Sequence, residues 1–437
     1  METIQAAPNV EYDDLAPSSH SIEDENPFAT MMASFDEAAD KVGLDPDLYA
    51  LLRKPDREIK ISLPTQLDDG TLAILDGYRV QHNSGLGPYF GPLRIHAGLQ
   101  LEELRALAGW MTWKCALLNV PFGGSAGGIR MSAKRHSRAE LERAVRRYVS
   151  GMIGDIGSDR DIFAGDLATD EQVMAWVMDT VSMHSHTTEN AVVCGKPLKL
   201  GGTHGHAEAV AQGMRILLGP ALERAGLPRT GAKVIIQGAG RRGGNLAQLL
   251  AKDGHVIVGM SDVYGGIYNA KGLDVAAAVR ARVDHNDLRK SKDKFEVLTN
   301  DDLVEQACDV FMPCAVANVV HLRNARSIQC KLIVEGSHAA VSPRSDRILR
   351  ERHISVVPDI LATGGGTVVN YFEWVQNRAG YSWLPDVVQH RLERFMLEAW
   401  AEVATVSKEQ DARLRMAAHM VAVKRVAAAD RLRGVYA

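Results

Sequence analysis

The stretch GPYFGPLRIHAGLQLEELRALAGWMTWKCALLNVPFGGSAGGIR, from Gly87 to Arg130, decides how the first half of this chain folds. It begins with a Gly/Pro turn at residues 87–92, continues as an apolar helix that ends at Lys114, and closes in a second glycine-rich loop at residues 121–128. Two glycine clusters around a basic residue favour a floor where backbone closely approaches a small anionic ligand. Two ordinary turns around a core helix are the alternative.

Length and composition restrict the class of protein. At 437 residues the chain is long enough for two or three domains. A net charge of -4 without a basic run does not favour nucleic acid or an acidic membrane as a partner, and no apolar run is long enough to span a bilayer. The cysteines are odd in number, show no CxxC, and follow no signal peptide, so we expect reduced thiols and a cytoplasmic protein.

Local patterns outside this stretch predict a tail, a hairpin and a helix. Residues 1–26 are acidic, with Pro and Ser among them, which predicts a disordered tail. Residues 59–64 and 72–81 alternate in hydrophobicity around an Asp-Gly turn at residues 69–70, which is typical of a β-hairpin. Residues 137–153 predict a helix that begins with a capping box.

Residues 231–269 indicate a nucleotide-binding unit. A short apolar strand, a helix and a second strand follow one another, and glycines lie between the first strand and the helix. These glycines have G-x-G-x-x-G spacing: Gly238, Gly240 and Gly243. Later short strands alternate with loops and helices, so we predict an α/β fold with a doubly wound Rossmann domain and a second α/β domain.

This pattern predicts how a dinucleotide would bind. Gly240 would let the backbone approach the pyrophosphate, which the helix N-terminus would hold. Asp262, at the end of the second strand, would accept a hydrogen bond from a ribose hydroxyl, which favours NAD. Arg241 and Arg242 could assist a phosphate, so NADP remains possible.

Four motifs identify a family resemblance. They are WMTWKCALLNVPFGG (110–124), GKPLKLGG (195–202), PDILA (358–362) and YFEWVQN (371–377). Together they resemble the glutamate/leucine/phenylalanine/valine dehydrogenase family, and most of all its glutamate dehydrogenase branch. The resemblance covers about residues 30–435 in the family's order.

The resemblance implies an architecture and a reaction. It implies a substrate and oligomerisation domain at 27–200, a dinucleotide-binding domain at 201–366 and C-terminal helices at 367–437 that return to the substrate domain. A cleft between the domains and a homohexamer are usual in the family. The family's reaction is the reversible oxidative deamination of an L-amino acid to a 2-oxo acid and ammonia.

The resemblance also assigns roles to three positions of the substrate half. Lys114 would pair with the substrate α-carboxylate, and Asp166, in FAGD, would transfer protons to and from the amino nitrogen. The family's catalytic lysine, in PFGGAKGG, is replaced by Ala126. A methyl group transfers no proton, and losing a general acid/base group typically costs about 10²–10⁴-fold in rate. Lys134, eight residues on, is not an obvious substitute.

Other substrate-half positions differ from the family pattern as well. Phe90 stands where a lysine of the GPxKGG turn, which includes Gly91, would hold the side-chain carboxylate of glutamate. Phe90 therefore favours an apolar or aromatic substrate, or else fills an unused pocket. Asn370 replaces a serine that helps select glutamate, and we expect Arg94 and His96 to support the turn. Further departures are Pro92, His204, His206, His338 and Thr363.

The histidines raise the possibility of zinc, but the H-x-H pairs lie in predicted loops, so we expect no metal site. The histidines concerned are His184, His186, His204, His206 and His338. Trp110 and Trp113 are expected in the helix core, and Cys115 and Cys314 are expected to pack as small hydrophobes.

Two functions follow from these patterns. The first is an NAD(P)-dependent amino-acid dehydrogenase with an altered substrate or reduced activity. The alternative is a catalytically inactive paralogue that serves as a regulatory or structural subunit. The expected partners are an amino acid, its 2-oxo acid and ammonia, within a homohexamer or a mixed hexamer, without nucleic acid or membrane.

Overall fold

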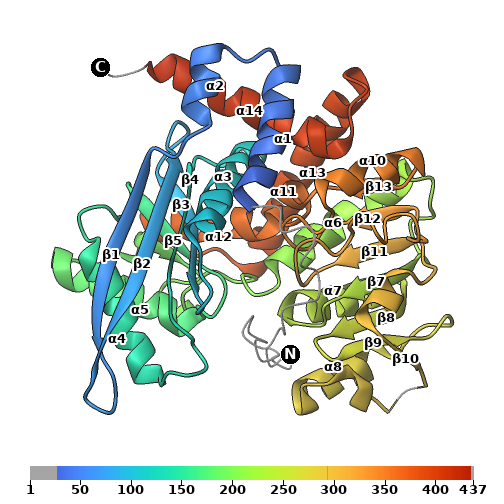
Figure 1. Cartoon of the computed structure of the whole chain (residues 1–437), viewed down its shortest axis with the longest axis horizontal. Helices are drawn as coiled ribbons and strands as arrows, with labels where there is room; N and C mark the ends of the chain where they lie inside the picture. The colour runs from blue at the N-terminus through green and yellow to red at the C-terminus, as the bar shows by residue number, and fades with distance from the viewer. Residues whose placement is uncertain (1–26, 293, 435–437) are drawn as a thin grey trace. The chain divides into compact units, whose positions relative to one another are not determined.

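The computed structural model describes residues 27–292 and 294–434 (Figure 1). The predicted acidic tail lies outside these residues. The described chain divides into two compact units. The N-terminal unit contains residues 27–206, 367–391 and 416–434, and the central unit contains Ala207–Gly366 and Leu392–Arg415.

A six-stranded mixed sheet with the order β1-β2-β4-β3-β5-β6 forms the N-terminal unit. β1, β2 and β4 pair antiparallel, whereas β4, β3, β5 and β6 pair parallel. The predicted hairpin is confirmed, and Gly70 in its turn has φ +84°. The strands are β1 (Arg57–Gln66), β2 (Leu72–Asn83), β3 (Tyr89–Ile95), β4 (Gly124–Ile129), β5 (Asp161–Gly165) and β6 (Val193–Cys194).

Helices cover both faces of this sheet. One face packs on α4 and α5 through a core that includes Tyr148 and Val177. The predicted capping box of α4 is present, because Ser137 and Glu140 each bond the other's backbone N–H. The first helices are α1 (Pro27–Lys41), α2 (Pro46–Leu52), α3 (Leu101–Leu117), α4 (Arg138–Gly151) and α5 (Glu171–Ser185).

The opposite face of the sheet packs on α3, which is buried on every side from residue 106 to residue 117. On its other side α3 contacts α1, where the rings of Phe35 and Trp113 stack with centroids 5.2 Å apart. The expectation that Trp110 and Trp113 belong to the core is confirmed, since they are 8% and 0% exposed. A largely apolar helix that is buried all round is typical of this double coverage.

The predicted glycine turns around α3 are wrong in part, because both glycine clusters continue as strands. Residues 89–95 form β3 and residues 124–129 form β4, and the two strands pair parallel. The glycines of these strands allow neighbouring segments to pack closely, and they do not form turns. A Cβ on Gly91 would lie 1.5 Å from the carbonyl oxygen of Ser125, and one on Gly124 would lie 2.2 Å from Thr112 Oγ1 on α3.

The central unit is a seven-stranded sheet with the order β10-β9-β8-β7-β11-β12-β13. The five strands from β8 to β13 in this order pair parallel, and β9 and β10 add antiparallel pairs at one edge. The strands are β7 (Lys233–Gln237), β8 (Val256–Asp262), β9 (Gly265–Tyr268), β10 (Glu296–Leu298), β11 (Val310–Pro313), β12 (Leu332–Val334) and β13 (Ser355–Val357). The predicted doubly wound Rossmann fold is confirmed.

The chain leaves β7 toward β8 and later returns to the other side of β7 as β11, so the order reverses between β7 and β11. In open α/β sheets, ligands bind outside the carboxyl ends of the strands at such a switch point. The helices of this region are α6 (Ala209–Arg224), α7 (Arg241–Lys252), α8 (Val275–His285), α9 (Asn300–Val304), α10 (Pro343–Glu351) and α11 (Asp359–Ala362).

Three long helices form the last part of the described chain, which was expected to be helical. Each of them crosses a boundary between the two units. They are α12 (Gly364–Ala379), α13 (Pro385–Glu409) and α14 (Leu414–Arg433).

Candidate active site and dinucleotide site

Lys114 lies in the last turn of α3 and is 4% exposed. Its charge lies close enough to the neighbouring thiol of Cys115 to oppose the rise in the Cys115 pKa that burial causes. Cys115 and Cys314 are buried, as expected for cysteines that pack as small hydrophobes.

Ala126 is the third residue of β4, is fully buried and pairs with Val80 on β2. Side chains alternate along a strand, so Ala126 shares a face with Gly124, which packs against α3. Lys114 belongs to the helix on that same face. A lysine at position 126 would therefore project toward the α3 side of the sheet, where this chain presents only a methyl group.

The other face of β4 carries a buried polar network that the sequence did not reveal. Arg79 Nε donates to Asp161 Oδ2 at 2.9 Å, and both side chains are 0% exposed. Ser125 Oγ accepts from Arg79 at 2.7 Å and donates to Asp161 Oδ1 at 2.8 Å. Buried charges are stable only when paired and hydrogen-bonded in this way. This network anchors β4 beneath the position of Ala126.

Asp166 follows β5 directly and is held by an arginine. Arg94 Nε on β3 donates to Asp166 Oδ2 at 2.5 Å, and Arg94 Nη1 donates to Glu103 Oε1 on α3 at 2.5 Å. His96 Nε2 lies 3.2 Å from Glu103 Oε2. Burial would lower the pKa of Arg94, but the charges of Asp166 and Glu103 raise it above its ordinary value. Arg94 thus does more than support a turn, because it orients the Asp166 carboxylate.

Phe90 is packed inside the unit. Its ring stacks on Phe122 with centroids 4.9 Å apart, and the two residues are 1% and 0% exposed. Tyr371 and Trp374 of α12 meet Phe122 edge-on, with centroids 5.7 and 5.3 Å away. Such aromatic clusters pack tightly. Of the two interpretations of Phe90, the filled pocket agrees better with this packing.

Asn370 on α12 contacts a second departure from the family pattern. His206 Nε2 lies 2.9 Å from Asn370 Oδ1, so the side-chain oxygen of Asn370 is engaged within the unit. The ring of His206 also covers Gly195, whose Cβ would lie 2.9 Å from it. Two residues that the sequence analysis treated separately thus form one contact.

A buried ion pair joins helix α12 to the segment that precedes α6. Lys196 Nζ lies 2.7 Å from Glu373 Oε1 and donates to Val193 O at 2.8 Å, and both charged side chains are 0% exposed. Glu373 also accepts from the backbone N–H groups of Gly195 and Thr203, at 3.0 and 3.3 Å. The GKP and FEW motifs contained both residues, but sequence alone did not show that they pair.

The central unit places its three predicted glycines between the end of β7 and the first turn of α7. Gly238 has φ +97°, and a Cβ on Gly243 would lie 1.9 Å from Gly238 O. Gly240 is the N-cap of α7, makes no side-chain cap bond, and has open space around its Cβ position. The first N–H groups of a helix have no partner within the helix and attract anions. These residues fit the pyrophosphate of a dinucleotide.

Asp262 ends β8, as predicted, with its carboxylate held in place. Oδ1 accepts from Tyr264 N at 2.8 Å and Oδ2 accepts from Leu288 N at 2.7 Å. Each oxygen retains a lone pair for a ribose hydroxyl. Arg242 donates to Gly336 O, toward β12, so its guanidinium is not directed at Asp262. Both features agree with NAD more than with a 2′-phosphate.

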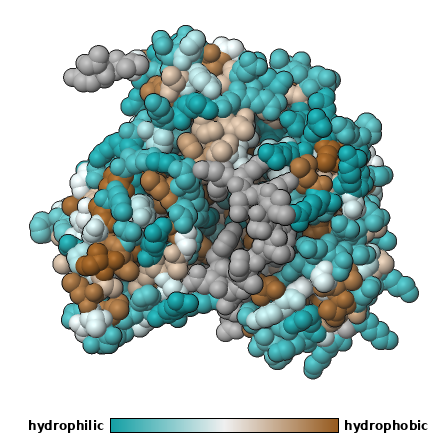
Figure 2. Space-filling model, in the orientation of Figure 1, coloured by the Kyte–Doolittle hydropathy of each residue, from teal (hydrophilic) through white to brown (hydrophobic). Residues whose placement is uncertain are grey.

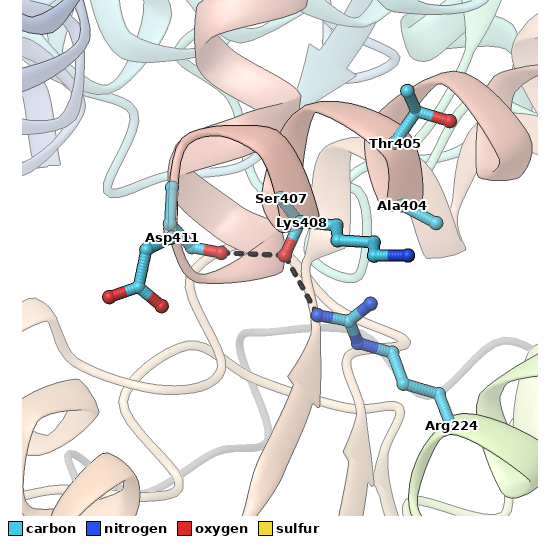
Figure 3. Close-up of a pocket in the computed structure, with 7 residues that line it drawn as sticks. Arg224, Ala404, Thr405, Ser407, Lys408 and Asp411 are labelled. Carbon is cyan, nitrogen blue, oxygen red and sulfur yellow. Dashed lines mark hydrogen bonds between the residues drawn. The ribbon is translucent and has the colours of Figure 1, made fainter.

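A separate cavity of about 530 Å³ lies in the central unit (Figure 3). Arg224 reaches from α6 to α13, where it donates to Ser407 Oγ at 2.8 Å. Arg224 and Lys408 stand in the last turns of their helices, where cations offset the helix dipole. The lining residues are Arg224, Ala404, Thr405, Ser407, Lys408, Asp411 and Ala412. This lining includes none of the predicted site residues.

Neither a metal cluster nor a membrane span is found in the described part of the chain. Its His, Cys, Asp and Glu residues form no group of three or more that could hold a metal ion. No helix among residues 27–292 and 294–434 is long and apolar enough to cross a membrane.

The two units define a class of protein: a dinucleotide-binding Rossmann domain joined to a second α/β domain. Residues 201–434 match the Glutamate/Leucine/Phenylalanine/Valine dehydrogenase family, and residues 55–183 match the Glu/Leu/Phe/Val dehydrogenase, dimerisation domain. The chain belongs to the glutamate/leucine/phenylalanine/valine dehydrogenase family.

Individual relatives agree with this assignment. The glutamate dehydrogenase of Thermotoga maritima is 41% identical over 403 residues, which cover 92% of this chain and 97% of the relative. The NAD-specific glutamate dehydrogenase of Staphylococcus aureus is 38% identical, with 91% and 96% covered. A hetero-hexameric glutamate dehydrogenase from Thermus thermophilus, in a Leu-bound form, matches with a TM-score of 0.91 at 36% identity, covering 95% of this chain and 99% of that chain.

Proposed function

We propose that this chain is an NAD-binding member of its family that serves as a non-catalytic subunit of a dehydrogenase hexamer. One observation carries the proposal: Ala126, fully buried on β4, stands where the family pattern has its catalytic lysine. A buried methyl group can neither transfer a proton nor stabilise an oxyanion, and Lys134 is exposed beyond the end of β4.

Two further contacts support the loss of turnover on glutamate. Phe90 and Phe122 stack in the interior, so an aromatic ring takes the position from which a lysine would hold a glutamate side chain. Asp166 is engaged by Arg94 at 2.5 Å. The guanidinium of Arg94 therefore occupies one carboxylate oxygen of Asp166, which leaves that oxygen less able to contact the amino group of a substrate.

NAD is the dinucleotide of the central unit. The glycines and α7 N-terminus fit its pyrophosphate, and Asp262 fits a free ribose hydroxyl. The Staphylococcus aureus relative carries the description NAD-specific. When bound, the nicotinamide supplies hydride transfer, and the residues of this chain bind and orient it.

Assembly with other subunits is supported by the surface of the N-terminal unit. Its matched family domain is described as a dimerisation domain, and the Thermus thermophilus protein is hetero-hexameric. β1 is an edge strand, and Leu72 and Ile74 on β2 are 63% and 64% exposed. Figure 2 shows a largely hydrophilic face with hydrophobic patches over this unit. An exposed edge strand with apolar residues favours pairing with another chain.

The test is turnover by the purified chain. We expect NADH to bind, and no NADH to form with a panel of L-amino acids. Mixing with an active family member from the same cell should give a mixed hexamer that size-exclusion chromatography and mass spectrometry detect. Robust turnover by the chain alone would refute the proposal.

A second function is supported by Lys114 and Asp166, which occupy the family positions for substrate carboxylate and proton transfer. It is slow dehydrogenation of an apolar amino acid, with Phe90 against the substrate side chain. The same panel distinguishes the two functions, because leucine, valine or phenylalanine would then produce NADH where glutamate does not.

A further inference from the structure

His338 lies at the carboxyl edge of the central sheet, in the loop that follows β12. Two hydrogen bonds place this loop beside the start of α7 and the end of β11. Arg242, at the start of α7, donates to Gly336 O. Gly336 N donates to Pro313 O, at the end of β11, at 2.8 Å. His338 therefore lies on the β11–β12 side of the switch point.

A buried carboxylate faces the imidazole of His338. His338 Nδ1 lies 3.6 Å from Asp359 Oδ2, and the two side chains are 27% and 3% exposed. Asp359 Oδ2 also accepts from Ala339 N at 3.1 Å, so the carboxylate is fixed in place. The imidazole thus has one side against a buried acid and another side exposed.

The surrounding charges keep this acid ionised. Burial alone would raise the pKa of Asp359, but the adjacent imidazole of His338 and the charge of Arg415 lower it well below its ordinary value. Arg415, on α14, lies 3.6 Å from Asp359 Oδ1, 2.7 Å from Glu335 Oε2 and 3.8 Å from Asp346 Oδ2. These groups come from the end of β12, α10, α11 and α14. The imidazole of His338 therefore lies beside a carboxylate that stays ionised.

The position of His338 matches one half of a bound dinucleotide. Asp262, at the end of β8, marks the side of the switch point where the first ribose lies. The second nucleotide then lies across the switch point, over β11 and β12. We propose that His338, oriented by Asp359, faces the nicotinamide half and makes the central unit prefer the reduced dinucleotide over the oxidised one when the imidazole is protonated.

The preference follows from charge. The oxidised nicotinamide ring carries a positive charge and the reduced ring carries none, so an imidazolium nearby repels only the oxidised form. Two unit charges a few ångströms apart at a solvent-accessible site change an affinity by about tenfold. Histidine changes its charge near neutral pH, so the preference should change there too. This inference rests on the dinucleotide binding proposed above and not on the loss of turnover.

The experiment is a titration of the full chain with NADH and, separately, with NAD⁺, by calorimetry from about pH 6 to about pH 8.5. The ratio of the Kd for NAD⁺ to the Kd for NADH should be about tenfold larger at the acidic end. His338→Asn and His338→Gln should remove this change. His353→Asn is the matched control, because His353 is exposed at the opposite, amino end of β13, and it should behave as the wild type.

The outcomes separate this inference from the proposed function. If the ratio changes with pH equally in the wild type and in both His338 variants, or does not change in the wild type, the role of His338 is refuted. Absence of NADH binding would refute both this role and NAD binding. Turnover by the chain alone would refute the non-catalytic proposal and leave the pH-dependent ratio standing.

Discussion

The glycines of the central unit and those of the N-terminal unit meet similar constraints, but the residues beside them do not. Gly243 and Gly91 both lie where a Cβ would overlap a backbone oxygen, that of Gly238 or of Ser125. In the central unit the neighbouring features, the α7 N-terminus and Asp262, still suit a dinucleotide. In the N-terminal unit the neighbouring side chains, Phe90 and Ala126, carry no charge.

This difference shows that the fold of a site and its chemistry depend on different residues. Backbone contacts such as Gly91 against Ser125 O determine whether β3 and β4 can pair, so they tolerate no side chain. Phe90 and Ala126 are compatible with the same strands and the same sheet. Side chains at such positions can therefore change while the architecture of the family persists.

Introducing lysines at positions 90 and 126 is expected to have the largest effect on activity. We expect Phe90→Lys with Ala126→Lys to raise glutamate-dependent NADH formation by about 10²–10⁴-fold, because the Ala126→Lys change supplies a proton-transfer group and the Phe90→Lys change supplies a partner for the side-chain carboxylate. Steady-state assays of NADH absorbance measure this. Ala133→Lys, beyond the end of β4, is the control and should leave the rate unchanged. No gain in the double variant would show that these two side chains are not sufficient for turnover of glutamate.

Breaking the Lys196–Glu373 pair should be the largest effect on stability. Both charges are fully buried, so Lys196→Met would leave the side chain of Glu373 without its cation and lower the free energy of unfolding by about 3–5 kcal/mol. Urea unfolding monitored by circular dichroism measures the loss. Adding Glu373→Gln should recover part of it, and Lys199→Met, exposed in the same segment, should cost little. Equal losses in the Lys196 and Lys199 variants would show that the ion pair is not important.

His82 should make the N-terminal unit sensitive to acid. Burial lowers the pKa of His82 from 6.5 to about 4, so the folded state resists protonation that the unfolded chain accepts. The stability from neutral His82 is present above pH 6.5 and is lost as pH falls toward 4, by up to about 3 kcal/mol.

Urea midpoints at about pH 7 and about pH 4.5 measure this loss. His82→Gln retains a partner for Thr112 Oγ1, now 2.9 Å from His82 Nδ1, and should flatten the acid dependence. The exposed His353→Gln should retain the wild-type slope. An unchanged slope in His82→Gln would assign the acid sensitivity to other groups.

Adding one methyl group at the dinucleotide site, by the change Gly243→Ala, should have the smallest free-energy effect of these variants. It tests the role of the central unit directly. Gly243→Ala would bring a Cβ within 1.9 Å of Gly238 O, displace the loop and raise the Kd for NADH about tenfold or more. Fluorescence titration measures the Kd. Gly219→Ala in α6, where a Cβ meets open space, should bind NADH normally. Normal binding by Gly243→Ala would show that this loop does not hold the pyrophosphate.

Several elements could be predicted because their signals are local. The Asp-Gly hairpin, the capping box of α4 and the strand–glycine–helix unit each depend on residues close in sequence. The strands β3 and β4 could not be recognised in this way. Their glycines are typical of turns, and only the packing of Gly91 on Ser125 and of Gly124 on α3 explains them.

In the candidate site, too, local motifs could be recognised from the sequence but long-range contacts could not. Lys114, Asp166 and Ala126 were identified by position within motifs. Their surroundings were not, because Arg94 and Asp166 are 72 residues apart in the sequence and meet only through the pairing of β3 with β5. No local pattern encodes such a contact.

By itself the sequence determined the family, the Rossmann fold and the absence of a lysine at position 126, because motif spacing and residue identity need no coordinates. The tertiary structure alone decided that Phe90 is buried against Phe122, that Asp166 is held by Arg94, and that Asp359 faces His338. The reason is physical. Burial and ion pairing depend on which segments, distant in the sequence, pack in the same core. That packing is determined only when the whole chain folds.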